Sequence, residues 1–147
     1  ADARTALGVL LPSELAALGI TSVDGIPVGN QSWVRFTLAG DSDLDRTVDF
    51  ADLVRLAQSY GTTAATWAQG DSNYDGEVNF ADLVALAQAY QSSLLLNGSQ
   101  MSALTGVGGE SFAAEWRRAV ALVPEPFMAS VGAIALGGLL RRPRRRS

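Results

Sequence analysis

An internal repeat with a period of 30 residues constrains this chain more than any other feature. Residues 41–61 and 71–91 align without gaps, and thirteen of the twenty-one positions are identical. In each copy a polar first half is followed by a second half with apolar residues at helical spacing. Short helices with one apolar face are unstable alone. The repeat therefore predicts two related loop–helix units whose helices pack against each other.

The predicted helix faces have the same composition in both copies. In the first they comprise Phe50, Leu53, Val54, Ala57 and Tyr60, and in the second Phe80, Leu83, Val84, Ala87 and Tyr90. The intervening segment 62–70 is expected to be a connector in which Trp67 covers an edge of the core between the helices.

The polar half of each repeat has oxygen-bearing residues at the ligand positions of a twelve-residue calcium loop, which are 1, 3, 5, 7, 9 and 12. In loop one (residues 41–52) they are Asp41, Asp43, Asp45, Thr47, Asp49 and Asp52. In loop two (residues 71–82) they are Asp71, Asn73, Asp75, Glu77, Asn79 and Asp82. The pattern predicts two bound calcium ions. Position 8 is Val48 or Val78, and we expect these two residues to form a short bridge between the loops.

The two loops differ at position 6, where the backbone turns sharply. Gly76 suits that turn in loop two, whereas Arg46 brings a positive φ and a positive charge to loop one. Loop one has five carboxylates at ligand positions, which attract calcium but repel one another without it. The relative affinities therefore stay open, with the turn favouring loop two. Magnesium is the competing ion, although its tight octahedron suits such a loop poorly. Two solvated acidic turns that cap helices are the alternative without metal.

The composition removes most catalytic chemistry. The chain has no cysteine, histidine or lysine, which excludes thiol nucleophiles, the usual zinc sites, Ser-His-Asp triads and Schiff-base lysines. We therefore expect no enzyme. Five of the eleven arginines lie in residues 141–147, which leaves six arginines against fifteen acids elsewhere, a balance of −9. Such an acidic body argues against nucleic-acid binding.

The duplicated loop–helix pattern of residues 41–91, with aspartate at position 12, resembles a type I dockerin. The resemblance implies a fold that depends on calcium and a cohesin-like module as partner, in complexes that degrade polysaccharides. One departure concerns loop positions 10 and 11, where cohesin-binding members often carry a hydroxyl pair. Here those positions are Phe50-Ala51 and Phe80-Ala81.

The C-terminus, residues 123–147, resembles a PEP-CTERM sorting signal. Its elements are Val123, Pro124, Glu125 and Pro126, the uncharged stretch 127–140, and Arg141, Arg142, Arg144, Arg145 and Arg146. The resemblance implies export, processing by an exosortase-type enzyme and contact with a membrane through residues 127–140. Fourteen helical residues span about 21 Å, less than the roughly 30 Å of a hydrocarbon core. A processed signal is thus expected, with a short anchor or a core helix as alternatives.

The remaining segments complete the expected organisation. Residues 1–40 read as a mixed segment at the end of a larger upstream domain, with a helix at Pro12–Gly19 and a strand at Ser32–Leu38. Residues 92–122 read as a Ser- and Gly-rich linker to 110, then an amphipathic helix. The predicted fold class is mainly α, namely a dockerin- or EF-hand-like pair of calcium loop–helix repeats with a C-terminal apolar helix.

The predicted function is that of an exported calcium-binding module at the cell surface or outside the cell, which serves protein docking or surface display. A calcium-rigidified stalk without a partner is one alternative. Another is a targeting appendage of an upstream carbohydrate-active enzyme. A cytosolic calcium sensor fits the sorting-like tail poorly.

Overall fold

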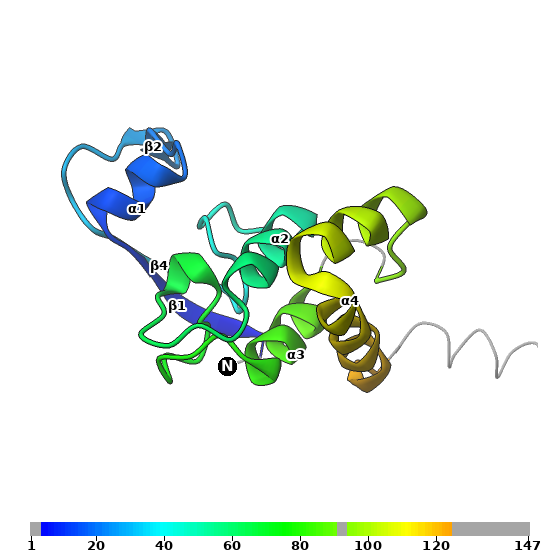
Figure 1. Ribbon diagram of the computed structural model, residues 1–147. Helices are drawn as coiled ribbons and strands as arrows, with labels where there is room; N and C mark the ends of the chain where they lie inside the picture. The colour runs from blue at the N-terminus through cyan, green and yellow to red at the C-terminus, as the bar shows by residue number, and fades with distance from the viewer. Residues whose placement is uncertain (1–3, 91–93, 125–147) are drawn as a thin grey trace, which may run out of the picture.

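The computed structural model describes residues 4–90 and 94–124 (Figure 1). The elements, in chain order, are β1 (Thr5–Leu10), α1 (Pro12–Ala17), β2 (Ser22–Val23), β3 (Ile26–Pro27), β4 (Trp33–Leu38), α2 (Phe50–Ser59), the 3-10 turn η1 (Trp67–Gln69), α3 (Phe80–Ala89) and α4 (Gly98–Leu122). About 46% of the structure is helical and 15% is strand, so the fold is mixed α/β. The expectation of a mainly α fold is wrong, because residues 5–38 satisfy much of their backbone hydrogen bonding in strands.

The N-terminal residues form two small antiparallel sheets. Strand β1 pairs with β4, with Thr5 opposite Leu38 and Leu10 opposite Trp33, and β2 pairs with β3. The predicted helix and strand are both confirmed as α1 and β4. On β4, however, the outward side carries Val34 and Phe36, which are 57% and 66% exposed.

The helices of the repeats begin at equivalent residues, Phe50 and Phe80, and both have ten residues. Leu53 and Leu83 are fully buried in one shared cluster, as the helical spacing predicts. Leu56 and Leu86, which the predicted faces leave out, are also 0% exposed. The apolar face is therefore wider than expected, because a further helix covers it.

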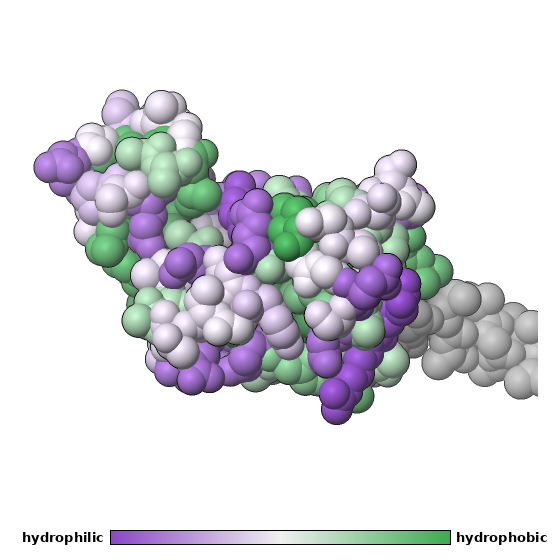
Figure 2. All heavy atoms as spheres, in the orientation of Figure 1, coloured by the Kyte–Doolittle hydropathy of each residue, from purple (hydrophilic) through white to green (hydrophobic). Residues whose placement is uncertain are grey.

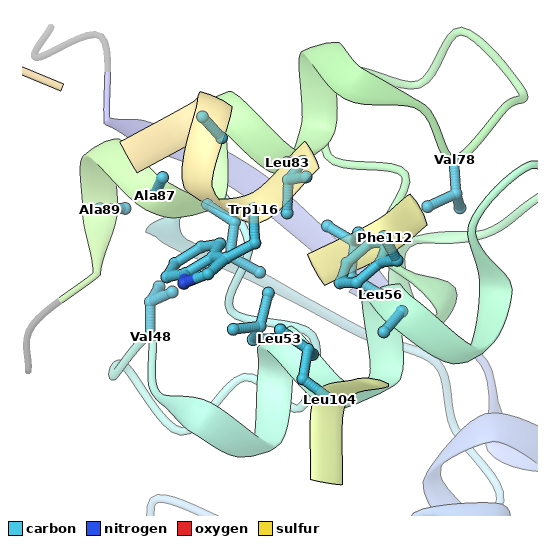
Figure 3. Packing of buried hydrophobic residues seen from close by; sticks show 13 residues of the cluster. Val48, Leu53, Leu56, Val78, Leu83, Ala87, Ala89, Leu104, Phe112 and Trp116 are labelled. Carbon is cyan, nitrogen blue, oxygen red and sulfur yellow. The ribbon is translucent and has the colours of Figure 1, made fainter. Parts of the chain in front are cut away.

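That further helix is α4, which contacts both α2 and α3. It begins at Gly98, inside the segment expected to be a linker, and it is interrupted at Gly109. Its buried side chains Leu104, Phe112 and Trp116 join the cluster of the repeats (Figure 3). The linker expected to residue 110 is thus wrong over residues 98–110. Burial against two neighbouring helices outweighs the weak helix propensity of Gly106 and Gly108.

Aromatic contacts show how α4 matches the repeat. Tyr60, after α2, packs edge-on against Phe112 with ring centroids 5.0 Å apart. Tyr90, the equivalent residue after α3, packs edge-on against Trp116 at 5.6 Å. Phe112 and Trp116 are one helical turn apart, so α4 offers one aromatic ring to each repeat. Glu110 and Arg117 are exposed on α4. Figure 2 shows hydrophilic residues over the C-terminal half of this helix.

Trp67 lies in a different place from the one expected. It is 2% exposed and belongs to a second cluster with Leu10, Leu15, Val23, Val28 and Leu44. Its indole N–H donates to the backbone oxygen of Asp41 at 2.7 Å, and its ring stacks on Tyr74 at 5.6 Å. Trp67 therefore joins the N-terminal sheets to both loops and belongs to a cluster other than the one shared by α2 and α3.

Val78 was expected to form a bridge with Val48, but its backbone pairs with the residues that follow α2. The Val78 backbone accepts a hydrogen bond from Gly61 N–H at 2.8 Å and donates one to Thr62 O at 3.1 Å. Both valine side chains are fully buried in the helical cluster. The residues that follow α2 thus pair with loop two.

The residues before the two loops pack on the opposite helices. A Cβ added to Gly40 would lie 2.9 Å from Leu86 Cβ on α3, and one added to Gly70 would lie 3.1 Å from Leu56 Cβ on α2. Both glycines have a positive φ, +97° and +110°. Each loop therefore enters on the helix of the other repeat, and both conformation and space require glycine there.

No helix among residues 4–90 and 94–124 has the length and apolar character needed to cross a membrane. The stretch 127–140, expected to be an apolar helix, lies outside the described residues, as does most of the predicted sorting signal.

We predict that Gly40→Ala lowers the free energy of unfolding by about 3 kcal/mol, since it adds a positive-φ penalty and a clash with Leu86. Gly61→Ala is the matched control, because Gly61 has a φ of +83° but no atom near the added Cβ. It should cost only about 1 kcal/mol. Urea unfolding followed by tryptophan fluorescence measures both, and equal losses would contradict the close packing.

Candidate metal centres

Loop two brings three of its predicted ligands together. One carboxylate oxygen from each of Asp71, Asp75 and Asp82 lies within 4.8 Å of the others. Oxygens on opposite sides of a calcium ion are about 5 Å apart, because each Ca–O bond is about 2.3–2.6 Å. One ion can therefore contact all three residues, which come from positions 1, 5 and 12.

The backbone of loop two holds these carboxylates in place. Asp82 Oδ1 accepts from Ser72 N–H at 2.9 Å and from its hydroxyl at 3.2 Å, and Asp82 Oδ2 accepts from Asn79 N–H at 3.0 Å. Asp71 Oδ2 accepts from Gly76 N–H at 2.9 Å. The position 12 residue thus ties the start of the loop to the start of α3.

The other oxygen of Asp71 is different. Asp71 is 1% exposed, and its Oδ1 is buried without a hydrogen-bond partner in the part of the chain that the structure describes. A buried charged oxygen without a partner is costly, and native proteins nearly always satisfy such groups. A cation between Asp71, Asp75 and Asp82 would satisfy it.

Positions 3, 7 and 9 of loop two have supporting roles. Asn73 Oδ1 accepts from Asp75 N–H at 2.9 Å, and Asn79 Oδ1 caps α3 by accepting from Ala81 N–H at 2.8 Å. Glu77 is exposed, and its N–H donates to Asp75 Oδ1 at 2.9 Å. A metal ligand from position 7 would be the backbone carbonyl of Glu77, which is the position 7 ligand of twelve-residue calcium loops.

Loop one gathers a different set, with oxygens of Asp41, Asp43 and Asp45 within 4.8 Å of one another. Both oxygens of the fully buried Asp41 carboxylate accept hydrogen bonds: Oδ1 from Asp45 N–H at 3.1 Å, and Oδ2 from Arg46 N–H at 2.9 Å and from the Thr37 hydroxyl. Asp49 caps α2 through Ala51 N–H at 2.8 Å. Thr47 donates through its hydroxyl to Asp45 Oδ1 at 2.6 Å.

Asp52, at position 12 of loop one, is 2% exposed and closes its loop as Asp82 does. Its Oδ1 accepts from Ser42 N–H at 3.0 Å and its Oδ2 from Asp49 N–H at 3.0 Å. It also accepts from Arg55 Nη1 at 3.3 Å, and the same nitrogen contacts Asp43 Oδ2 at 2.9 Å. An arginine therefore lies among the predicted ligands of loop one.

The turn at position 6 has a positive φ in both loops, +76° at Arg46 and +87° at Gly76. The predicted strain at Arg46 is thus present in the backbone. Its side chain, however, points its guanidinium to Asp24, with Nη2 at 2.9 Å from Oδ2. The charge of Arg46 is paired outside the cluster of predicted ligands.

Burial dominates the acidities of the enclosed carboxyls. It raises the pKa of Asp41 to about 6, although the Thr37 hydroxyl and Arg46 N–H oppose the rise. It raises the pKa of Asp82 as well, and that of Asp52 to about 7. For Asp52, hydrogen bonds from Ser42 and from Asp49 N–H oppose the rise in pKa, whereas the nearby Asp43 carboxylate adds to it. Exposed Asp75 behaves oppositely, since hydrogen bonding, first from Glu77 N–H, lowers its pKa.

Several residues that matter here were not among the predicted ones. Ser42 and Ser72 occupy position 2 in both repeats and donate to the position 12 carboxylate. Their identity in the two copies was a signal available in the alignment. Arg55, which aligns with Ala85 of the second copy, was another such signal. Thr37 lies outside the repeat, and no sequence pattern connects it to Asp41.

Of the predicted sorting residues, the structure describes two. Val123 caps the C-terminal end of α4 in an extended conformation, and Pro124 follows it. Glu125, Pro126 and the five arginines from Arg141 to Arg146 lie outside the described residues.

Comparison of the chain with protein-family models, curated proteins and solved structures found no match.

We predict that the metal-free protein becomes less stable as the pH rises from about 4 to about 6. The pKa of Asp41 is higher in the fold than its ordinary 3.8, so the fold binds more protons than the unfolded chain in this window and loses stability as Asp41 ionises. Urea unfolding in calcium-depleted buffers measures the trend, and Asp41→Asn should reduce it. A rise in stability across this window would contradict the assignment.

Proposed function

We propose that this chain carries a calcium-binding, dockerin-like module that serves protein docking or surface display. The observation that carries the proposal is the buried Oδ1 of Asp71, which has no hydrogen-bond partner among the described residues and lies beside the carboxylates of Asp75 and Asp82. The cluster contains oxygen donors alone, which is the donor set of hard cations such as calcium and magnesium. Calcium is favoured because it accepts irregular geometry and many protein ligands, whereas magnesium retains waters.

Metal binding and folding would be linked in such a module. The position 1 and 12 carboxylates are buried in both loops, and position 12 lies in the first turn of each helix. An ion would offset the burial cost of these charges and hold each loop on its helix. Any ligand that binds only the folded state stabilises that state.

The docking role is the finer part of the proposal. In the dockerin-like reading, loop positions 10 and 11 face a cohesin-like partner. Phe50 and Phe80 pack against the helical cluster, and Arg118 lies over the Phe80 ring at 4.8 Å. Ala51 and Ala81 are exposed. A partner at this surface would therefore contact alanines and the side of α4, so a stalk without a partner remains the second candidate.

Export and sorting complete the proposal. They rest on the resemblance of residues 123–147 to a PEP-CTERM signal, and millimolar extracellular calcium suits the loops. In this proposal an exosortase-type enzyme processes the C-terminal segment, which contacts the membrane through residues 127–140. The calcium module is displayed at the surface or outside the cell. The same arrangement would serve as the appendage of an upstream carbohydrate-active enzyme.

The full chain is the material for the test, because α4 and the N-terminal sheets pack on the repeats. We predict that calcium raises the thermal midpoint and releases or absorbs measurable heat, and that Asp71→Asn removes at least one site. Isothermal titration calorimetry and thermal unfolding with calcium, magnesium and chelator measure this. Glu110→Gln, which removes an exposed charge on α4, is the matched control and should bind as the unaltered chain does.

A chain that shows no calcium heat and the same thermal midpoint in chelator would contradict the calcium-binding role. Docking has a separate test, which is capture of cohesin-type modules by the calcium-loaded chain. Calcium-dependent capture that Asp71→Asn abolishes favours docking, whereas calcium binding without capture favours the stalk.

A further inference from the structure

The guanidinium of Arg55 occupies the space between ligand positions of loop one. Its Nη1 lies 2.9 Å from Asp43 Oδ2, 3.3 Å from Asp52 Oδ1 and 3.2 Å from the Ser42 hydroxyl. The Arg55 side chain is 25% exposed, Asp43 is 20% exposed and Asp52 is 2% exposed. These charges are thus largely removed from water. An ion pair in such a partly buried place is stronger than one at a fully exposed surface.

Repeat two has no such cation at the equivalent place. The residue that aligns with Arg55 is Ala85 of α3. Its methyl group carries no charge and makes no hydrogen bond. The Asp82 carboxylate instead accepts from Ser72 and Asn79 alone among the contacts of the described residues.

The position 1 carboxylates also differ, because the one in loop one has more hydrogen-bond donors than the one in loop two. Asp41 accepts from the Thr37 hydroxyl and from the N–H groups of Asp45 and Arg46, so both of its oxygens have donors. Asp71 has a donor for Oδ2, whereas its buried Oδ1 accepts nothing from the described residues. In loop one, donors of the protein reach both oxygens of Asp41, Asp43 and Asp52. In loop two, the buried Oδ1 of Asp71 has no donor among the described residues.

We propose that Arg55 acts as a built-in cation in loop one, so that loop two is the strong calcium site and loop one binds calcium only after Arg55 leaves. The inference rests on the proposed calcium-binding function and adds which loop is filled first and which residue decides it. At loop one, an incoming ion must displace a bound guanidinium and meets its positive charge. At loop two, it satisfies an oxygen that lacks a partner.

The test is calorimetric titration of the full chain with calcium, with the number of bound ions counted by native mass spectrometry. The unaltered chain should show one strong site, lost in Asp71→Asn, and a second site about tenfold to a hundredfold weaker, the range expected for one adjacent charge. Arg55→Gln keeps a hydrogen-bond donor without the charge and should make the second site strong. Arg117→Gln, the same change at an exposed position of α4, should leave both sites unchanged.

The converse variant guards against misfolding of loop one. Ala85→Arg supplies repeat two with the missing cation and should weaken the strong site by a similar factor. Two equal sites in the unaltered chain, or an Arg55→Gln titration that matches Arg117→Gln, would overturn this inference and leave calcium binding intact. No binding by any variant would overturn the proposed function, and the inference with it.

Discussion

The buried carboxylate at position 12 is the contact on which each repeat depends. Asp52 and Asp82 each accept the N–H of position 2 on one oxygen and the N–H of position 9 on the other. A single side chain therefore joins the first turn of a helix to both ends of its loop. The position 9 side chain caps the same helix. Because these bonds use main-chain donors, they fix the path of each loop relative to its helix.

The hydrogen bonds that close the loops also determine which loop residues enter the core. With the loops fixed on their helices, Val48 and Val78 turn into the cluster that Leu53, Leu83 and α4 share. The N-terminal sheets meet the repeats at a second cluster, in which Leu44 of loop one and Trp67 of the connector are buried. Trp67 contacts both loops, through the Asp41 carbonyl and the Tyr74 ring. The N-terminal and C-terminal segments are consequently part of the structure that supports the loops.

Sequence reasoning worked where one pattern is written twice. The helices at Phe50 and Phe80 and the triads of loop two and loop one follow from offsets that the alignment exposes. It failed where long-range packing decides the outcome. The glycines and serines of residues 98–110 have the composition of a linker, yet Leu104 is buried in the cluster of the repeats and this part of the segment is helical. Arg55 has the spacing of any solvated helix residue, and only the folded loop shows which carboxylates it meets. The mainly α expectation failed because short strands carry little pattern of their own.

The packing of Gly40 on Leu86 and of Gly70 on Leu56 is reciprocal. Residue i of one repeat contacts residue j of the other, and residue j of the first contacts residue i of the second, which is the rule of an isologous dimer interface. At this contact the two repeats are therefore related as the subunits of a twofold homodimer would be, although one chain joins them. Unlike the subunits of a homodimer, two repeats of one chain can carry different residues at equivalent positions, as Arg55 and Ala85 do.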